Sequence, residues 1–178
     1  MITQATMRRN ILLHLDAARD NPLWELGAHW YVREAESLGT RNEIRPSLVV
    51  ALLSPQLSWK RNKYAAQALM NGNPKPAGVL SRSWYQALNA WASGQHEFGP
   101  RARKTHAFAQ LLFNPFDPVQ VCLDVWALRC VGLPKDFRLT PTLYHYVSQA
   151  YRHVAFQAGL RPSQVQAISW CAIRGRAQ

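Results

Sequence analysis

The spacing of apolar residues between prolines and glycines most constrains the fold of this chain. Apolar side chains recur three to four residues apart through most of the sequence, whereas no segment clearly alternates apolar and polar residues like a β-strand. Gly and Pro divide this pattern into segments of helical length. Residues 48–53 are apolar on every side of the expected helix and should lie at the centre of the fold. The sequence therefore predicts an all-α protein.

The length and composition favour a single packed domain. A chain of 178 residues is long enough to bury a hydrophobic core, and 48% of its residues are hydrophobic. The turn-rich segment 71–76 is the best internal boundary in the sequence. It separates an N-terminal lobe of about residues 1–73, to which we assign the C-terminal helices, from a hairpin half of about residues 78–133. Because the connector is short, we expect one all-helical domain over residues 1–178.

The sequence lacks the features of a membrane or secreted protein. No apolar run is long enough to span a bilayer, and Asp16 and Asp20 interrupt the N-terminal segment, which predicts a folded helix there instead of a signal peptide. Cys122, Cys130 and Cys171 lie in apolar helical contexts, which indicates buried thiols in a reducing compartment. We therefore expect a cytoplasmic protein without membrane association.

The charge of the chain is strongly positive. Its 21 Lys and Arg residues exceed its 10 Asp and Glu residues, so the net charge is +11. A polyanion is the usual partner that makes such an excess useful. The basic residues fall on several turns and loops and form no single basic tail, which favours nucleic acid over an acidic membrane surface. No His or Cys spacing predicts a metal site, and no cofactor is expected.

The clearest candidate chemistry lies between residues 98 and 133, where a basic helix, a proline-rich loop and a second helix follow one another. Lys104 falls in the first turn of the first helix, and Asp124 occupies the N-cap position of the second. The positive end of a helix dipole stabilises the ionised form of a carboxylate at that position. Taken alone, Asp124 is explained as a helix cap and Lys104 as a surface cation.

The same stretch resembles the helix-hairpin-helix DNA glycosylases of the endonuclease III type, the HhH-GPD superfamily. In that superfamily a lysine–threonine pair, matched here by Lys104-Thr105, begins the second helix of a hairpin. Its catalytic aspartate, matched by Asp124, begins the next helix, and an arginine matched by Arg129 follows five residues later. The resemblance implies a two-lobed helical fold in which double-stranded DNA lies across the cleft between the lobes.

A second motif that carries the resemblance follows the apolar helix. These glycosylases have a leucine-serine-x-glutamine motif, matched here by residues 53–56, whose glutamine or its neighbours enter the DNA near the extruded nucleotide. The resemblance thus assigns Gln56 to DNA contact, where its amide can pair with an orphaned base. The alternative is a helix-end amide that bonds backbone carbonyls. Lys60 and Arg61, on the next helix, are expected on the same DNA-binding surface.

The turn of the expected hairpin departs from the superfamily pattern. The usual turn reads apolar-Pro-Gly-x-Gly and binds a phosphate through its free amides. Here residues 98–103 read FGPRAR, with the single glycine Gly99 followed by Pro100, which has no amide donor. The hairpin is therefore degenerate, and we expect Arg101 and Arg103 to hold part of the phosphate through charge-assisted hydrogen bonds.

Four aromatic residues are expected to line a base pocket: Trp30, Tyr31, Trp59 and Trp126. The alternative for Trp30 and Tyr31 is packing within the helical core. Many endonuclease III-like proteins carry an iron–sulfur cluster near the C-terminus, but the four-cysteine run that holds it is absent here. The chain is in this respect similar to compact glycosylases of phages, mobile elements and defence systems, some of which act on hypermodified bases.

The resemblance implies a monomeric N-glycosylase that flips a modified or damaged base out of duplex DNA, hydrolyses its N-glycosidic bond and leaves an abasic site. Asp124 would stabilise the cationic sugar. Lys104 matches the Schiff-base lysine, whose attack on C1′ would add AP-lyase activity, whereas a lysine held against phosphate would leave base removal alone. The alternatives are a non-catalytic helical DNA-binding module and a base-modifying transferase on the same scaffold. The expected location is the cytoplasm of a prokaryote, associated with the nucleoid, with the gene carried by the cell or by a phage.

Overall fold

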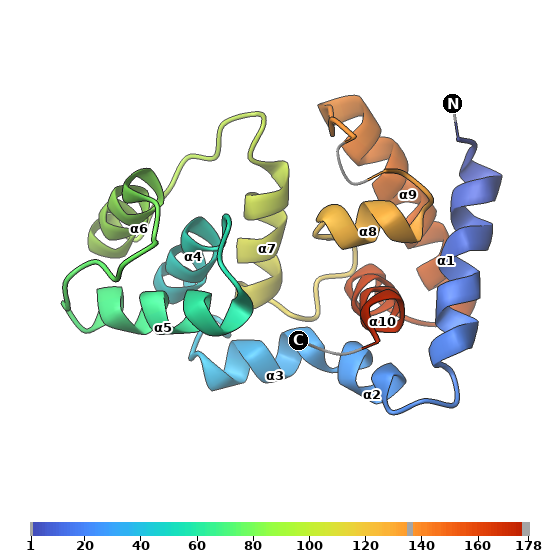
Figure 1. The fold of residues 1–178 in the computed structure, drawn as a ribbon, viewed down its shortest axis with the longest axis horizontal. Coiled ribbons are helices and arrows are strands. Elements are labelled where there is room, and N and C mark those ends of the chain that lie inside the picture. The colour runs from blue at the N-terminus through green and yellow to red at the C-terminus, as the bar shows by residue number, and fades with distance from the viewer. Residues whose placement is uncertain (1, 135–136, 176–178) are drawn as a thin grey trace. The chain divides into compact units, whose positions relative to one another are not determined.

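The computed structural model of the protein describes residues 2–134 and 137–175, and these residues form a helical fold (Figure 1). Ten α-helices and no β-strand occur in the described residues, which confirms the all-α class. In chain order the helices are α1 (Gln4–Ala18), α2 (Leu23–Ala28), α3 (Trp30–Ser37), α4 (Ile44–Leu53), α5 (Trp59–Met70), α6 (Ser81–Ser93), α7 (Arg103–Phe113), α8 (Val125–Cys130), α9 (Pro141–Ala158) and α10 (Pro162–Arg174).

The helices form two compact units. The terminal unit combines the two ends of the chain, Met1–Arg33 and Phe116–Gln178, and the middle unit is the continuous segment Glu34–Pro115. The sequence-based boundary at residues 71–76 lies inside the middle unit, where it joins α5 to α6. The reason is long-range packing, because α5 and α6 both contact α4, whereas α1 contacts α9 and α10.

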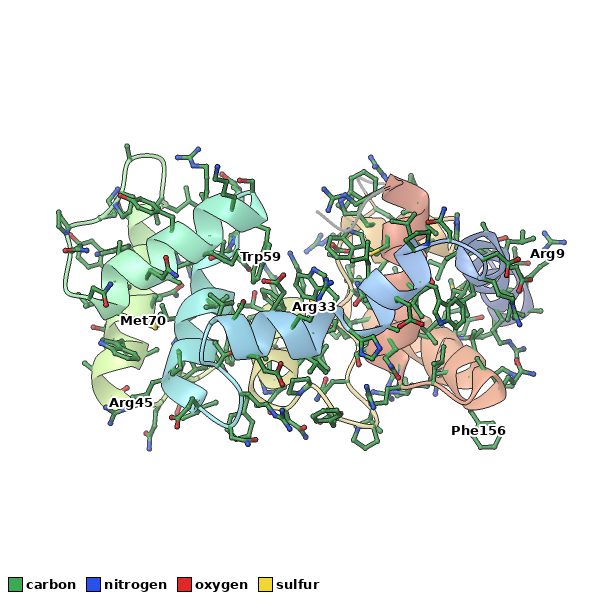
Figure 2. All side chains as sticks on the ribbon, turned by 90° about the horizontal axis from the view of Figure 1, so that it is seen from below. Arg9, Arg33, Arg45, Trp59, Met70 and Phe156 are labelled. Atoms are coloured by element: carbon green, nitrogen blue, oxygen red, sulfur yellow. The ribbon has the colours of Figure 1, made fainter. Side chains whose placement is uncertain are left out.

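The terminal unit is built around α10, which packs against α1, α2, α8 and α9. The buried face of α1 consists of Met7, Ile11, Leu15 and Ala18, and these positions recur every three to four residues, as an amphipathic helix requires. Exposed residues on the same unit include Arg9 of α1 and Phe156 near the end of α9, and Phe156 is 89% exposed (Figure 2).

The middle unit is built around α4, which contacts α5, α6 and α7. All residues of α4 from Ser47 to Leu53 are buried, so the expectation that residues 48–53 occupy a central position is confirmed for this unit. On α5, the Asn62 side-chain nitrogen Nδ2 donates a hydrogen bond of 3.1 Å to the Val50 carbonyl oxygen. Helix α4 therefore forms the centre of the middle unit, and α5, α6 and α7 pack around it.

All three cysteines are buried free thiols, as the sequence indicates. Among the residues that the structure describes, no helix has both the length and the apolar composition needed to cross a membrane. Within the same residues, no three His, Cys, Asp or Glu side chains lie close enough together to hold a metal ion.

Candidate functional site

Asp124 begins α8 as its N-cap residue, which confirms the local prediction. Its backbone is extended, with φ −97° and ψ −176°, so the side chain folds back over the first turn of the helix. The carboxylate oxygen Oδ1 accepts hydrogen bonds from the backbone nitrogens of Trp126 at 3.0 Å and Ala127 at 2.8 Å. Two amides therefore hold the half-buried carboxylate in one orientation.

Two tyrosines of α9 fix the backbone on either side of Asp124. The hydroxyl of Tyr144 donates a hydrogen bond of 2.6 Å to the carbonyl oxygen of Val121, just before the cap. The hydroxyl of Tyr151 donates a hydrogen bond of 2.9 Å to the carbonyl oxygen of Ala127, in the first turn of α8. Tyr151 is fully buried, and the position of Asp124 thus depends on packing between α8 and α9.

Trp30 and Tyr31 pack in the core of the terminal unit. They are 5% and 6% exposed, and the Tyr31 hydroxyl donates a hydrogen bond of 3.0 Å to Oε1 of Gln166. The Trp30 ring meets Tyr31 edge-on at 4.8 Å and Trp170 edge-on at 5.4 Å between centroids. Burial chiefly raises the pKa of Tyr31 well above its ordinary value, and the nearby charge of Asp124 raises it further. Core packing therefore accounts for the placement of both rings.

Trp126 lies in a row of alternating aromatic and cationic side chains. The guanidinium of Arg129 lies 4.4 Å from the Trp126 ring centroid, and that of Arg174 lies 5.3 Å from the same ring. The Arg174 guanidinium also lies 5.0 Å from the ring of Trp170. Sequence reasoning missed Trp170 and Arg174, although their spacing of four residues on α10 places them on one helix face. The guanidinium groups of Arg129 and Arg174 thus both pack on the ring of Trp126, which lies two residues after Asp124 in the chain.

The expected phosphate-binding residues lie at the loop and helix start between α6 and α7. Gly99 and Arg101 are exposed in the loop, and Arg103 and Lys104 are exposed in the first turn of α7. Nothing lies within 4 Å of the position that a Cβ on Gly99 would occupy, so the turn is open. Lys104 belongs to the middle unit, whereas Asp124 belongs to the terminal unit.

Gln56 lies exposed in the turn that follows α4 and has a left-handed backbone. Its φ is 63°, and Asn42 is the only other non-glycine residue in the described part of the chain with a positive φ. This conformation suits glycine or asparagine, whereas a glutamine there costs free energy. Strained backbone conformations cluster at functional sites, so the exposed side-chain amide of Gln56 is a candidate for a binding contact.

The remaining predicted residues of the middle unit lie on α5. Trp59 donates a hydrogen bond of 3.0 Å from Nε1 to Oε2 of Glu34, and Lys60 is exposed. The Arg61 guanidinium donates a hydrogen bond of 2.7 Å to the carbonyl oxygen of Ala77. Arg61 therefore stabilises the turn before α6. The sequence indicated only a DNA contact for this residue and not this structural role.

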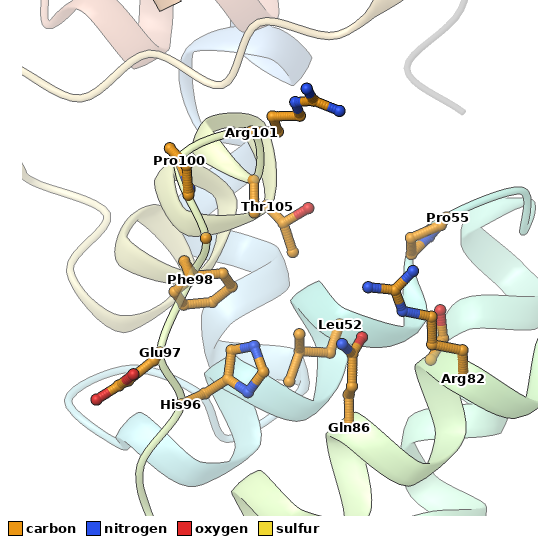
Figure 3. A pocket seen from close by; sticks show the side chains of 13 residues that line it. Leu52, Pro55, Arg82, Gln86, His96, Glu97, Phe98, Pro100, Arg101 and Thr105 are labelled. Atoms are coloured by element: carbon orange, nitrogen blue, oxygen red, sulfur yellow. The ribbon is translucent and has the colours of Figure 1, made fainter.

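The middle unit also contains a pocket of about 490 Å³ that sequence reasoning missed (Figure 3). It lies between the end of α4, one face of α6 and the loop before α7. Arg82 and Gln86 of α6 line it, and their spacing of four residues is the one sequence signal for a shared face. His96 and Phe98 contribute from the loop, and loop residues are harder to place from sequence.

The chain belongs to the family of unknown function DUF7178, whose model matches residues 1–177. The match extends through both units of the fold. No curated protein and no solved structure matches the chain.

Proposed function

We propose that the protein is a DNA glycosylase that removes a base from duplex DNA and uses Asp124 as its catalytic carboxylate. The observation that carries this proposal is the carboxylate itself, which two backbone amides hold at the start of α8. The packing of Arg129 on Trp126 adds positive charge on the same short helix. The net charge of +11 supports a polyanionic substrate.

The order of elements supports the same proposal. A loop joins α6 to α7, and Lys104 lies in the first turn of α7. Both helices pack on α4 and do not form a closely packed hairpin with each other, so the support comes from the order of elements alone. The chain then leaves the middle unit, and Asp124 begins the next helix in the terminal unit. The order of helix, loop, lysine, loop and aspartate along the chain is the one that the resemblance to the HhH-GPD superfamily implies, although the two helices are not packed as a hairpin.

The proposed reaction uses the negative charge of Asp124. Breaking the N-glycosidic bond transfers the bonding electron pair to the base, which takes up a proton, and leaves positive charge on the sugar. A carboxylate fixed beside C1′ stabilises this charge, and one such electrostatic partner contributes about 3–4 kcal/mol. Water then adds its oxygen to C1′ and releases a proton, and the product is an abasic site. The amides of Trp126 and Ala127 keep the carboxylate oriented throughout.

Lys104 is better suited to a phosphate contact than to a Schiff base. It is exposed at the start of α7, next to the exposed Arg101 and Arg103. A lysine becomes nucleophilic when it is desolvated or lies in an apolar pocket, and neither condition holds for an exposed side chain in a cationic turn. We therefore propose simple base hydrolysis without strand cleavage.

Base release by matched carboxylate variants tests this function. The protein is incubated with genomic DNAs that carry different modified bases, and abasic sites and free bases are measured. Asp117 provides the control, because its Oδ1 also accepts bonds from two backbone amides, at 2.8 and 2.7 Å, in the same unit. Asp124→Asn should lower base release at least ~100-fold and leave DNA affinity unchanged, whereas Asp117→Asn should leave both unchanged. Unaltered turnover by Asp124→Asn would contradict the proposal.

A non-catalytic DNA-binding module is the second candidate, and the exposure of Arg101, Arg103 and Lys104 favours it. This candidate predicts salt-sensitive DNA binding, no abasic product from any substrate and full tolerance of Asp124→Asn. A base-modifying transferase would instead require a small-molecule co-substrate in the same assay.

A further inference from the structure

The pocket of the middle unit has the dimensions of a ligand site. Its volume of about 490 Å³ lies within the range of about 300–1,000 Å³ that is usual for small-molecule pockets. Its walls come from α4, α6, the following loop and the first turn of α7, so all of them belong to the middle unit (Figure 3).

One wall of the pocket is apolar and includes a restrained aromatic ring. Leu52 is 5% exposed at the end of α4, and the ring of Phe98 projects from the loop into the pocket (Figure 3). His96 meets the Phe98 ring at 4.7 Å, nearly perpendicular, and His106 lies against it at 5.2 Å with a tilt of 33°. These neighbours hold the ring in place. A fixed ring beside an apolar floor is suited to stacking with a flat heteroaromatic group.

Neutral polar groups face this apolar wall. Gln86 extends from α6 into the pocket and offers two donors and an acceptor (Figure 3). Burial lowers the pKa of His96, and the nearby Glu97 opposes this only in part, so the imidazole is uncharged at neutral pH. A neutral imidazole provides one donor and one acceptor. Gln86 and His96 can therefore form hydrogen bonds with the polar edge of an uncharged heterocycle.

Two guanidinium groups give the pocket a positive mouth. Arg82 and Arg101 line it and are exposed, and no ion pair among the described residues involves either of them. Glu97 is the one acidic residue in the lining, and its carboxylate is directed away from Arg82 (Figure 3). Guanidinium groups bind phosphate through charge-assisted and often bidentate hydrogen bonds. The mouth is thus suited to a phosphate group.

We propose that this pocket binds a single unstacked nucleotide. Its base lies against Phe98 and bonds Gln86 and His96 through its edge. Its phosphate is held by Arg82 and Arg101. The inference is independent of base excision, because it depends on the chemistry of this pocket alone. The nucleotide is either part of a DNA strand or a free mononucleotide, and the two sources share this chemistry.

Binding of separate nucleotide parts tests the proposal. The full-length protein is titrated by calorimetry with deoxyadenosine monophosphate, deoxyadenosine, inorganic phosphate and a single-stranded pentanucleotide. We expect the mononucleotide to bind at least tenfold more tightly than either the nucleoside or phosphate, because only the nucleotide occupies both halves of the pocket. Absence of mononucleotide binding, or phosphate binding as tight as nucleotide binding, would overturn the proposal.

Two variants locate the binding in this pocket. Phe98→Leu keeps the apolar volume but removes the stacking face, and Arg82→Gln removes one cation. Each should weaken mononucleotide binding about tenfold or more. Phe156→Leu and Arg9→Gln are matched controls on exposed positions of the terminal unit and should have no effect (Figure 2). Wild-type affinity in Phe98→Leu would overturn the proposal, provided that circular dichroism shows a folded variant.

The same titrations separate the two sources of the nucleotide and the two proposals. A pentanucleotide that binds at least tenfold more tightly than the mononucleotide, and loses affinity in Phe98→Leu, identifies a DNA strand as the ligand. Equal affinity identifies a free nucleotide. Asp124→Asn should keep wild-type mononucleotide affinity, so failure of base excision and failure of nucleotide binding are distinguished.

Discussion

The backbones of Gly27 on α2 and Ile168 on α10 lie in direct contact, since a Cβ on Gly27 would lie 2.6 Å from the Ile168 Cα. Real Cβ atoms do not approach backbone atoms so closely, and no side-chain rotation relieves the overlap. Gly27 therefore permits the close packing of α2 on α10, the helix around which the terminal unit is built.

We predict that Gly27→Ala lowers the free energy of unfolding by about 1–3 kcal/mol, because the helices must separate to admit a methyl group. Gly99→Ala is the control, since nothing lies within 4 Å of the added Cβ and its backbone is not left-handed. It should change stability by less than about 0.5 kcal/mol or slightly increase it. Urea denaturation of both variants measures the difference, and equal stabilities would show that α2 and α10 can move apart at little cost.

A second prediction separates the two roles of Asp124. Asp124→Ala removes the acceptor of two amide hydrogen bonds and should destabilise the protein by about 1 kcal/mol, whereas Asp124→Asn keeps an acceptor and should cost less. Thr140→Ala, which removes the cap of α9, should cost a similar amount without affecting base release. If Asp124→Ala and Thr140→Ala reduce base release equally, the effect of Asp124 is on folding and not on chemistry.

Local signals in the sequence predicted the helices well. Pro141 begins α9 and Gly159, with φ 65°, ends it, and both are positions that these residues favour. The spacing of apolar residues predicts one helix across residues 22–38, whereas the structure has α2 and α3 with a break at His29. The sequence analysis grouped the C-terminal helices with the N-terminal helices, but it placed the internal boundary at residues 71–76. The structure instead keeps α5 and α6 in one unit, because both pack on α4.

The candidate site was predictable only where its residues follow one another. Asp124 could be placed as a helix cap because a cap is recognised from its own helix, whereas the DNA contact expected of Gln56 stays a prediction. The pocket residues Leu52, Arg82 and Phe98 come from three segments that meet only after α4, α6 and the loop pack together. Of the four aromatic residues expected in a base pocket, Trp30 and Tyr31 are buried, whereas Trp59 and Trp126 are partly exposed. This difference depends on packing and not on local sequence.

The buried thiols predict alkaline destabilisation. Burial raises the pKa of Cys130 from 9.0 to about 12 and that of Cys171 to about 11. Below pH 9 both thiols are protonated in the folded and unfolded states, so stability is fully retained. As the pH rises from 9 towards 11–12, the unfolded thiols ionise first, and each lowers the free energy of unfolding by up to about 1.4 kcal/mol per pH unit.

Urea denaturation at pH 8, 9, 10 and 10.5 (roughly the window below the raised thiol values) checks this prediction. The Cys130→Ala, Cys171→Ala double variant should show a smaller loss of stability across the series than the wild type. The buried Tyr31 and Tyr151, whose pKa values burial also raises, should retain part of the effect. An identical slope in wild type and double variant would show that the thiols ionise equally in both states.

The exposure of Lys104 predicts the outcome of borohydride trapping. On DNA that carries an abasic site, the wild-type protein should form no covalent adduct, because an exposed lysine lacks the desolvation that makes it nucleophilic. Lys104→Gln should keep base release but lower DNA affinity and reduce the salt slope by about 1, as loss of one phosphate contact does. An adduct that disappears in Lys104→Gln would instead assign AP-lyase chemistry to this residue.

The left-handed backbone of Gln56 predicts that a glycine at this position makes the protein more stable but weakens its contact with DNA. Gln56→Gly should keep or raise the free energy of unfolding, by up to about 1 kcal/mol, because glycine accepts a φ of 63° without strain. The same change removes the amide that we expect to contact DNA, so base release and DNA affinity should fall roughly tenfold. Asn42→Gly is the matched control, since Asn42 is also exposed with a φ of 61°, and it should leave both DNA functions unchanged. Denaturation and base-release assays on the two variants test this prediction. Equal base release by Gln56→Gly and Asn42→Gly would show that the strained turn contributes to the fold of the middle unit and not to DNA contact.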